Sequence, residues 1–322
     1  KVDLINVLDA MAGKDVRLTD SEVYSLDRVS WYSKERTDSL IEYGLINSLE
    51  SEKGLFVALE KDVEKEFIIY ETLVKKGTQE TGIKDETIKE AIEEFEAEKG
   101  FKLEKLQSDG INLCKYKAAV LSGCAGSGKT TVSDCITACL RKGLPNYKII
   151  YGAPTGKACR RLAEVVGGSV RTLNSQFGVG LTGEGYLQDI RKRKAKDSKS
   201  IYILDEMAMC NRDLLFAVCR CLGEDDIVYF LGDCKQLPPI GKGNPFHILM
   251  QLLPCIELGV SKRAAEGSNV NYNTTLVNCL SDGVEEELLY DESSFLCEEV
   301  SNADIPITSM KVWKGLMDGT YN

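Results

Sequence analysis

The chain has 322 residues, of which 43% are hydrophobic and 28% are charged, values that fit a globular protein of two or three domains. No stretch is apolar over the length of a membrane span, and the N-terminus has no signal-peptide pattern, so we expect no membrane partner. The 12 cysteines are scattered singly and His247 is the only histidine, which argues against zinc sites, a disulfide framework and histidine catalysis. Reduced thiols indicate the cytoplasm of a bacterium or of a phage-infected cell, or the nucleus if the source is eukaryotic.

The net charge of −10 is unevenly distributed along the chain. Residues 1–110 hold 16 basic and 26 acidic side chains, residues 111–264 hold 22 and 13, and residues 265–322 hold 2 and 11. The basic central block predicts contact with a polyanion such as nucleic acid. The acidic N-terminal part is expected to contact another protein instead.

The first 100 residues are predicted to be mostly helical. Apolar spacing predicts helix within residues 1–30, and residues 33–60 predict a helix that ends near Gly44, a turn and a small hairpin with a strand at Leu55–Leu59. This order of elements is similar to a winged helix. Further helices are predicted at about 62–76 and 85–98.

From residue 111 onward apolar runs alternate with helical patterns, which predicts an α/β fold with a parallel sheet and helices on both faces. A domain boundary is therefore expected near residues 100–110, after an N-terminal domain of residues 1–106. Asn211 is expected to cap one of the helices. The predicted strands are 118–122, 149–153, 201–204, 227–231 and 255–258. The predicted helices are 129–142, 156–166, 211–222, 244–253 and 268–280.

The stretch from Gly123 to Thr131 joins a predicted buried strand to a predicted helix and has the spacing of a phosphate-binding P-loop. Glycines allow successive backbone N–H groups to face a phosphate, and the helix N-terminus adds its positive dipole end. Lys129 would contact the β- and γ-phosphates, and the Thr130 hydroxyl would ligate Mg²⁺. The sequence therefore predicts a nucleoside triphosphate site formed by Gly123, Cys124, Ala125, Gly126, Ser127, Gly128, Lys129, Thr130 and Thr131.

Two neighbouring acids follow the predicted strand at 201–204. Asp205 is placed to hold the Mg²⁺ shell, and Glu206 to polarise the water that attacks the γ-phosphate. A second strand, at 227–231, leads into GDCKQLPP, where the Gln236 amide can donate to a phosphate oxygen or orient water. The prolines after Gln236 fix φ, so the loop is expected to transmit movement of the glutamine.

The alternation of strands and helices is interrupted between Gly178 and Ser200. Residues 178–190 predict a hairpin, and residues 191–199 hold six basic side chains and one acid. Beside a nucleotide site such a run predicts contact with a phosphate backbone, and a solvated loop is the other interpretation. The basic side chains that we single out are Arg191, Lys192, Arg193 and Lys194.

These motifs occur in the order and spacing of superfamily 1 helicases, and the chain resembles the RecD type, the exodeoxyribonuclease V alpha-subunit family. The resemblance covers about residues 105–280. It implies a RecA-like motor domain at 107–280, with residues 179–199 in the position of a small strand-separating hairpin domain. The segments that carry it are the P-loop, APTGKACRRL (153–162), VRTLNSQFG (170–178), ILDEMAM (203–209), LGDCKQLPP (231–239), GKGNPFHIL (241–249) and KRAAEGSNVNYNTTLV (262–277).

The resemblance also implies roles for individual residues. Gln107 matches the glutamine that reads adenine, and Arg263 matches an arginine that contacts the γ-phosphate. Thr155, Lys157 and Thr172 lie in motifs that contact single-stranded DNA. The implied catalytic residues are Lys129, Glu206, Gln236 and Arg263, and the implied nucleotide site adds Gln107, Asp205, Gln236 and Arg263 to the P-loop.

The chain departs from the family at Asn174, where histidine is usual, and at Ala264, where glutamine is usual. No segment after residue 280 resembles the second RecA-like domain, so we expect residues 281–322 to lead toward one. The resemblance implies an ATP-dependent DNA helicase that uses Mg²⁺ and moves 5′→3′ on single-stranded DNA or at a fork junction. The alternative is a nucleotide- and DNA-binding module that acts through a partner protein. A small-molecule kinase would leave LGDCKQLPP without a use.

Overall fold

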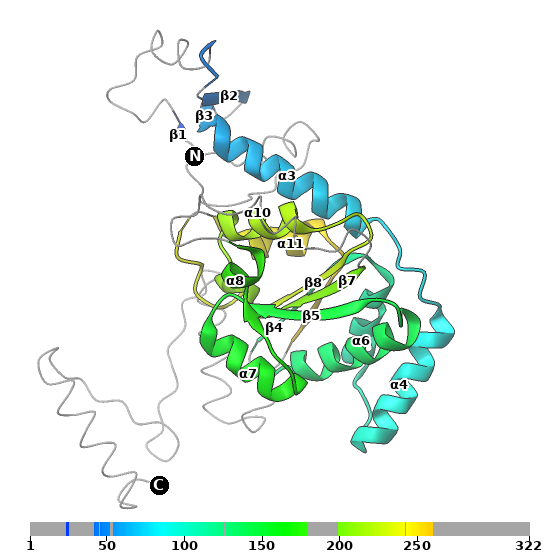
Figure 1. The fold of residues 1–322 in the computed structure, drawn as a ribbon. Helices are drawn as coiled ribbons and strands as arrows, with labels where there is room; N and C mark the ends of the chain where they lie inside the picture. The colour runs from blue at the N-terminus through cyan, green and yellow to red at the C-terminus, as the bar shows by residue number, and fades with distance from the viewer. Residues whose placement is uncertain are drawn as a thin grey trace, which may run out of the picture. The chain divides into compact units, whose positions relative to one another are not determined.

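A six-stranded parallel sheet forms the centre of the protein (Figure 1). The computed structural model describes residues 24–25, 42–44, 46–51, 54–124, 126–178, 199–241 and 243–259. The strand order is β6-β5-β7-β8-β4-β9, and every neighbouring pair runs parallel. The α/β class predicted from the alternation of strands and helices is therefore confirmed. The strands are β4 (Ala118–Gly123), β5 (Lys148–Ala153), β6 (Arg171–Thr172), β7 (Ser200–Leu204), β8 (Ile227–Gly232) and β9 (Cys255–Leu258).

Helices cover both faces of this sheet. The helices predicted between residues 62 and 253 are confirmed to within two residues, and α5, α8 and the two short 3₁₀ helices are additional. The helix predicted to end near Gly44 lies almost entirely outside the described residues. The helices are α3 (Glu60–Gly77), α4 (Asp85–Lys99), α5 (Lys105–Ile111), α6 (Lys129–Gly143), α7 (Gly156–Val166), α8 (Leu173–Phe177), α10 (Arg212–Cys221) and α11 (Pro245–Leu252). The 3₁₀ helices are η2 (Asn112–Lys115) and η3 (Met207–Met209).

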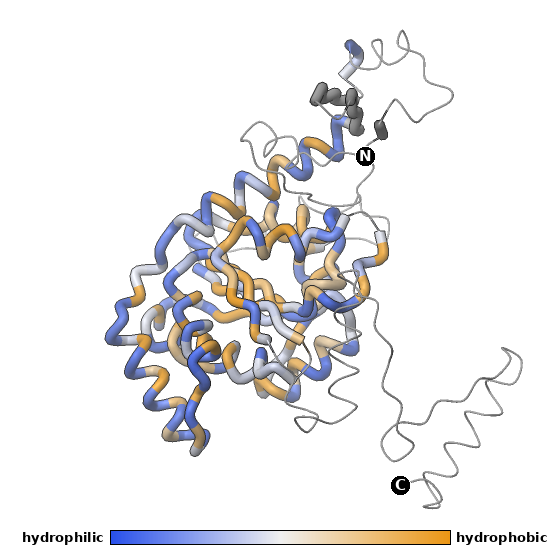
Figure 2. The backbone as a smooth tube through the Cα atoms, turned by 180° about the vertical axis from the view of Figure 1, so that it is seen from behind, coloured by the Kyte–Doolittle hydropathy of each residue, from blue (hydrophilic) through white to orange (hydrophobic). Residues whose placement is uncertain are grey.

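Two apolar cores lie on opposite faces of the sheet, because successive side chains of a strand alternate in direction. In β8, Val228 and Phe230 pack with α3, α8, α10 and α11, whereas Ile227 and Tyr229 pack with α4, α5 and α6. Figure 2 shows the result as predominantly orange central strands beneath helices of mixed hydropathy. Strands that are buried on both faces read as continuous apolar runs, and for this reason their bounds were predictable.

The N-terminal part contains a three-stranded antiparallel sheet in the order β1-β3-β2. The predicted hairpin is confirmed as β2 (Ile46–Ser51) and β3 (Gly54–Leu59), which pair from Ser51 with Gly54 outward. Helix was predicted within residues 1–30 and is wrong at β1 (Tyr24–Ser25), whose backbone pairs with β3. A pairing partner more than 30 residues away leaves no periodic trace in so short a segment, so the local pattern missed it.

The helices that precede the predicted boundary pack directly on the α/β layers. Helix α3 lies along α10, and Lys76 at its end donates to the carbonyls of Gly223, Glu224 and Asp226 at 2.8, 3.0 and 2.7 Å. Helix α4 packs against α6, where Lys142 pairs with Glu90 and Glu94. The boundary near residues 100–110 stays a prediction.

Several predicted segments lie outside the described residues. They are the hairpin domain at 179–199 except its last residue, the helix at 268–280 and the C-terminal segment 281–322. Among the described helices, none is long and apolar enough to cross a membrane. The cysteines of the described part are free thiols.

Candidate nucleotide site

The P-loop has the strand–loop–helix geometry that the sequence predicts. Gly126 and Gly128 take positive φ values of 86° and 95°, in the left-handed region that favours glycine. At Gly123 a Cβ atom would lie 2.5 Å from the Ser127 hydroxyl oxygen and 2.9 Å from the Leu258 carbonyl oxygen. Glycine is therefore required at Gly123 by close approach, and at the other two positions by backbone conformation.

The ammonium group of Lys129 lies over this loop. It donates to the carbonyl oxygen of Gly123 and, at 3.4 Å, to that of Cys124. Both partners are uncharged, so they leave the positive charge of the side chain available to an anion. Together with the N-terminus of the 15-residue helix α6, the loop has the donors and the backbone room that a polyphosphate needs.

Asp205 lies just beyond β7, at the carboxyl edge of the sheet where ligands of such folds bind. Its backbone N–H donates to Gly152 at 2.9 Å, and its carboxylate accepts the N–H of Glu206 at 2.8 Å. Burial raises the pKa of Asp205 above the ordinary 3.8, and the bond from Glu206 opposes this increase. A partly buried carboxylate whose charge is only partly compensated fits the ligand that a hard divalent cation prefers.

Glu206 has a left-handed backbone with φ of 56°, which no other non-glycine residue shares in the described part of the chain. This conformation costs about 1–2 kcal/mol in a residue with a Cβ atom. Strain of this kind is found at functional sites that the surrounding structure holds in place. The side chain of this strained residue also contacts the loop after β8, where Gln236 Nε2 donates to Glu206 Oε2 at 3.3 Å.

The loop after β8 is shaped by Asp233. Its carbonyl accepts the backbone N–H of Gln236 at 3.1 Å, and its carboxylate accepts that of Lys235 at 3.0 Å. These turns bring the Gln236 amide back toward β7. The structure thus brings together the two motifs that the sequence assigned to one site.

Gln107 has a position beside the P-loop and also a local structural role. It is buried, and its amide oxygen accepts the N–H of Glu104 at 3.1 Å, completing a capping box at the start of α5. Its amide nitrogen lies 2.3 Å from where a Cβ atom of Gly128 would stand. Contact of Gln107 with adenine stays a prediction.

Thr172 ends β6 and pairs with Ala153 of β5, and Thr155 follows two residues after Ala153 at the start of α7. Each threonine oxygen caps a helix, accepting from Ala158 at 3.2 Å and from Ser175 at 3.3 Å. The exposed Lys157 follows on α7. The three residues are close in the fold, and their contact with nucleic acid stays a prediction.

Other predicted site residues are not described by the structure. They are Ala125, Arg191, Lys192, Arg193, Lys194 and Arg263. The sequence reading missed a contact of Asn211, whose amide nitrogen donates to the Ile240 carbonyl in the Gln236 loop at 3.0 Å. Only the helix-capping role of Asn211 was predicted, and it is confirmed by the 3.0 Å bond from Leu214.

A sequence profile described as an AAA domain matches residues 102–295. The chain belongs to the AAA-domain family. It is 32% identical over 146 residues to the ATP-dependent RecD2 DNA helicase of Deinococcus radiodurans, covering 45% of this chain and 19% of the relative. It is 28% identical over 151 residues to the conjugal transfer protein TraA of Agrobacterium fabrum, covering 47% of this chain and 13% of the relative.

The chain thus spans less than a fifth of the length of these curated relatives. Among solved structures it is similar to the Pif1 helicase from Candida albicans, with a TM-score of 0.39 and 23% identity over 56% of this chain and 43% of the other. The predicted resemblance to the RecD type is confirmed by the match to RecD2. With its P-loop in place, this AAA-domain protein is a nucleotide-using protein.

Proposed function

We propose that the chain carries an ATP-hydrolysing motor domain that moves on single-stranded DNA, of the RecD type and with 5′→3′ polarity. The observation that carries the proposal is the Gln236–Glu206 hydrogen bond of 3.3 Å at the edge of the sheet where the P-loop opens. It joins a candidate general base to a side chain that can also contact a γ-phosphate. The similarity to an ATP-dependent DNA helicase supports the proposal that the nucleic acid is DNA.

Each residue then has a separate task in hydrolysis. Lys129 leaves its two loop carbonyls and binds the β- and γ-phosphate oxygens of ATP. Thr130 and Asp205 are the residues that would hold a Mg²⁺ accompanying the nucleotide, and such an ion would supply neutralisation of phosphate charge. Glu206 accepts the proton of the attacking water, and Gln236 exchanges its bond to Glu206 for one to the γ-phosphate.

The DNA partner is inferred from charge and from position. The central block of residues 111–264 has 22 basic and 13 acidic side chains, in a chain whose net charge is −10. Thr155, Lys157 and Thr172 lie near one another beyond β5 and β6. A phosphate backbone there would meet the N-terminus of α7 and the Lys157 ammonium.

The experiment compares ATP binding with ATP turnover in the full chain. Glu206→Gln is expected to keep Mg·ATP affinity and to lower DNA-stimulated phosphate release by about 10²- to 10⁴-fold, because an amide accepts no proton from water. Lys129→Ala is expected to weaken ATP binding by at least tenfold, or about 1.4 kcal/mol. Glu93→Gln, an exposed change on α4, is the matched control and leaves both quantities unchanged.

Wild-type turnover in Glu206→Gln would place the general base elsewhere. ATP and DNA binding without turnover by the wild type would favour the module that acts through a partner. Polarity is measured by displacement of streptavidin from biotinylated oligonucleotides. A 5′→3′ motor accelerates release from the 3′ end, and faster release from the 5′ end would contradict the stated direction.

A further inference from the structure

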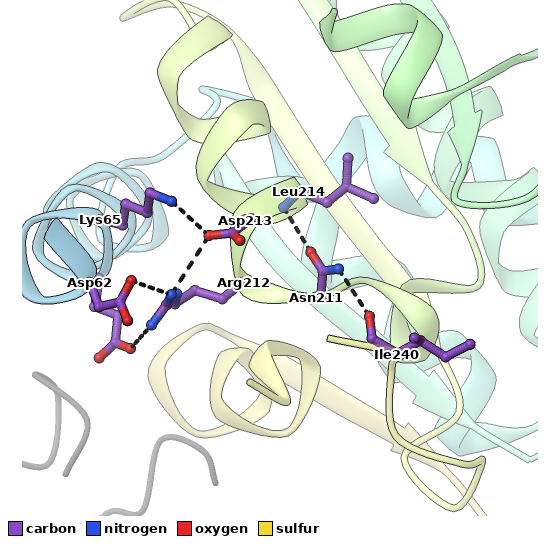
Figure 3. Close-up of polar contacts among 8 residues, drawn as sticks. Asp62, Lys65, Asn211, Arg212, Asp213, Leu214 and Ile240 are labelled. Carbon is purple, nitrogen blue, oxygen red and sulfur yellow. Dashed lines mark hydrogen bonds and ion pairs between the residues drawn. The ribbon is translucent and has the colours of Figure 1, made fainter. Parts of the chain in front are cut away.

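Asn211 links the helix that follows the candidate general base to the loop that carries Gln236. Its side chain forms two hydrogen bonds of 3.0 Å: Oδ1 accepts from the backbone N–H of Leu214, and Nδ2 donates to the carbonyl of Ile240 (Figure 3). The first bond caps α10. The second leaves the helix and holds a backbone atom of the neighbouring loop.

Little side-chain packing holds this loop. Leu237 is 86% exposed and Ile240 is 97% exposed, so neither anchors the segment through apolar contact. The two prolines between them fix φ, so they stiffen the segment but do not anchor it to the rest of the protein. Gln236 is the first residue of this stiff segment. Ile240 is its last residue, and the Ile240 carbonyl accepts the hydrogen bond from the Asn211 amide. The tether therefore fixes the far end of the segment whose near end contacts Glu206.

The loop backbone is also shaped to meet Asn211. Gly241 has φ of 114°, and a Cβ atom there would lie 2.8 Å from Asn211 Nδ2. A side chain at Gly241 would both strain the backbone and displace the amide. The close approach of Asn211 to the Ile240–Gly241 backbone therefore depends on glycine.

The base of the tether is itself fixed. Arg212, the first residue of α10, is 2% exposed and pairs with Asp62 at 2.7 Å and Glu66 at 3.1 Å on α3 (Figure 3). Asp213 pairs with Lys65 at 2.9 Å on the same helix. These contacts hold the N-terminus of α10 against α3, so Asn211 is a fixed anchor point for the loop.

From these contacts we propose that Asn211 is a positioning residue for nucleotide hydrolysis. It holds the loop so that Gln236 reaches Glu206 and the γ-phosphate. This inference rests on the proposed ATP hydrolysis at the site, and it assigns to Asn211 a function beyond capping α10. Asn211 touches neither the nucleotide nor water in this role, and it acts through the loop.

Substitutions at Asn211 can separate the two roles. Asn211→Asp keeps an oxygen that caps α10 and has no N–H to donate to Ile240. Asn211→Ser also keeps a capping oxygen, but its hydroxyl stands one atom closer to the backbone than Asn211 Nδ2 does. In the full chain with single-stranded DNA, we expect kcat to fall by about three- to tenfold, which corresponds to one net hydrogen bond. The KM for ATP and the thermal midpoint of unfolding are expected to stay at wild-type values, because the cap and the P-loop are intact.

Gly241→Ala tests the same tether from the loop side. It is expected to lower kcat by a similar factor, and the double variant with Asn211→Asp is expected to lose little more, because both changes break one contact. Gly168→Ala is the control, since Gly168 has open space around it and an ordinary backbone.

The outcomes distinguish this inference from the proposed function. Absence of DNA-stimulated hydrolysis in the wild type overturns both. Wild-type hydrolysis with an unchanged kcat in Asn211→Asp and Asn211→Ser overturns only the tether. Additive losses in the double variant, or a kcat that falls together with the unfolding midpoint, also overturn it, because Asn211 would then act only through helix stability.

Discussion

Gln236 Nε2 donates a hydrogen bond to Glu206 Oε2 over 3.3 Å, although 30 residues separate the two side chains. The contact joins the loop after β8 to the residue that follows Asp205. In this arrangement the amide lies against one oxygen of the carboxylate that we propose as the general base, and the other oxygen stays open to water. Gln236 is therefore placed beside the group whose chemistry it is proposed to assist.

Changing Gln236 to glutamate places two carboxylates at this contact. We expect Gln236→Glu to lower kcat by about 10²-fold, because a donor to developing phosphate charge is replaced by an anion. ATP affinity is expected to change much less, since Lys129 and the P-loop remain. Single-turnover phosphate release and fluorescent nucleotide titration measure the two quantities. A loss of affinity as large as the loss of rate would show that Gln236 binds ground-state ATP instead.

Asp205 provides a prediction with a defined pH dependence. Its pKa is raised by burial above 3.8, so its contribution to the free energy of unfolding is present below that value and is lost as pH rises through the raised pKa. Asp205→Asn removes this loss. We therefore expect the variant to be more stable than the wild type at neutral pH, and the difference to vanish at acidic pH.

Urea unfolding at several pH values, without Mg²⁺ or nucleotide, measures this difference. The same variant is expected to bind Mg·ATP more weakly, because an amide is a poorer ligand for Mg²⁺ than a carboxylate. A variant that is less stable at neutral pH would mean that the bond from the Glu206 N–H outweighs the burial of the charge.

The buried pairs of Arg212 predict how strongly α3 is attached to the α/β layers. Arg212→Met removes the guanidinium from Asp62 and Glu66, whose side chains are each 9% exposed in the wild type. Breaking such a buried pair costs about 3–5 kcal/mol of unfolding free energy. We expect a loss of this size in urea unfolding of the full chain.

The matched control is Lys75→Met, which breaks an ion pair with Glu224 whose side chains are 65% and 80% exposed. Water solvates the Glu224 carboxylate after that change, so no measurable loss of stability is expected. Restoring charge balance with Asp62→Asn and Glu66→Gln in the Arg212→Met background is expected to recover part of the loss. If the lysine control and Arg212→Met lost the same unfolding free energy, the account of a buried ion pair would be contradicted.

The sequence was most informative where one physical cause dominates a segment. Strands β4, β7 and β8 are buried along their whole length, so an apolar run between turns identifies them. The five-residue helix α8 and the two-residue strand β6 are too short for periodicity to be detected. The position of β6 depends on its pairing with β5, and that of α8 on its packing against α10 and the sheet, which is information that no local window contains.

The residues of the candidate site likewise divide into those that the sequence identifies and those whose contacts only the structure shows. The P-loop, Asp205 and Glu206 are recognisable because their chemistry fixes residue type and spacing. The helix caps formed by Thr155 and Thr172 were not predicted, because the family resemblance assigned the same two residues to contact with DNA. The bond from Asn211 to Ile240 was beyond prediction, because its acceptor is a backbone carbonyl and any residue at position 240 would provide one.

The run Arg191, Lys192, Arg193 and Lys194 provides the test of the predicted DNA contact. Replacing all four residues with alanine should weaken single-stranded DNA binding and reduce its salt dependence. Each lost phosphate contact lowers the slope of log affinity against log salt by roughly 0.7. A control with the same change in net charge replaces four exposed lysines elsewhere: Lys84, Lys89, Lys99 and Lys102.

The control is expected to shift affinity through long-range charge alone and to leave the slope at its wild-type value, because no phosphate contact is lost. Binding is measured by fluorescence anisotropy of a labelled oligonucleotide over a range of salt concentrations. Parallel slopes for the wild type and both variants would mean that the run at 191–194 is a solvated loop. The nucleotide site would be unaffected by that result, and DNA contact would then have to come from the region of Thr155, Lys157 and Thr172.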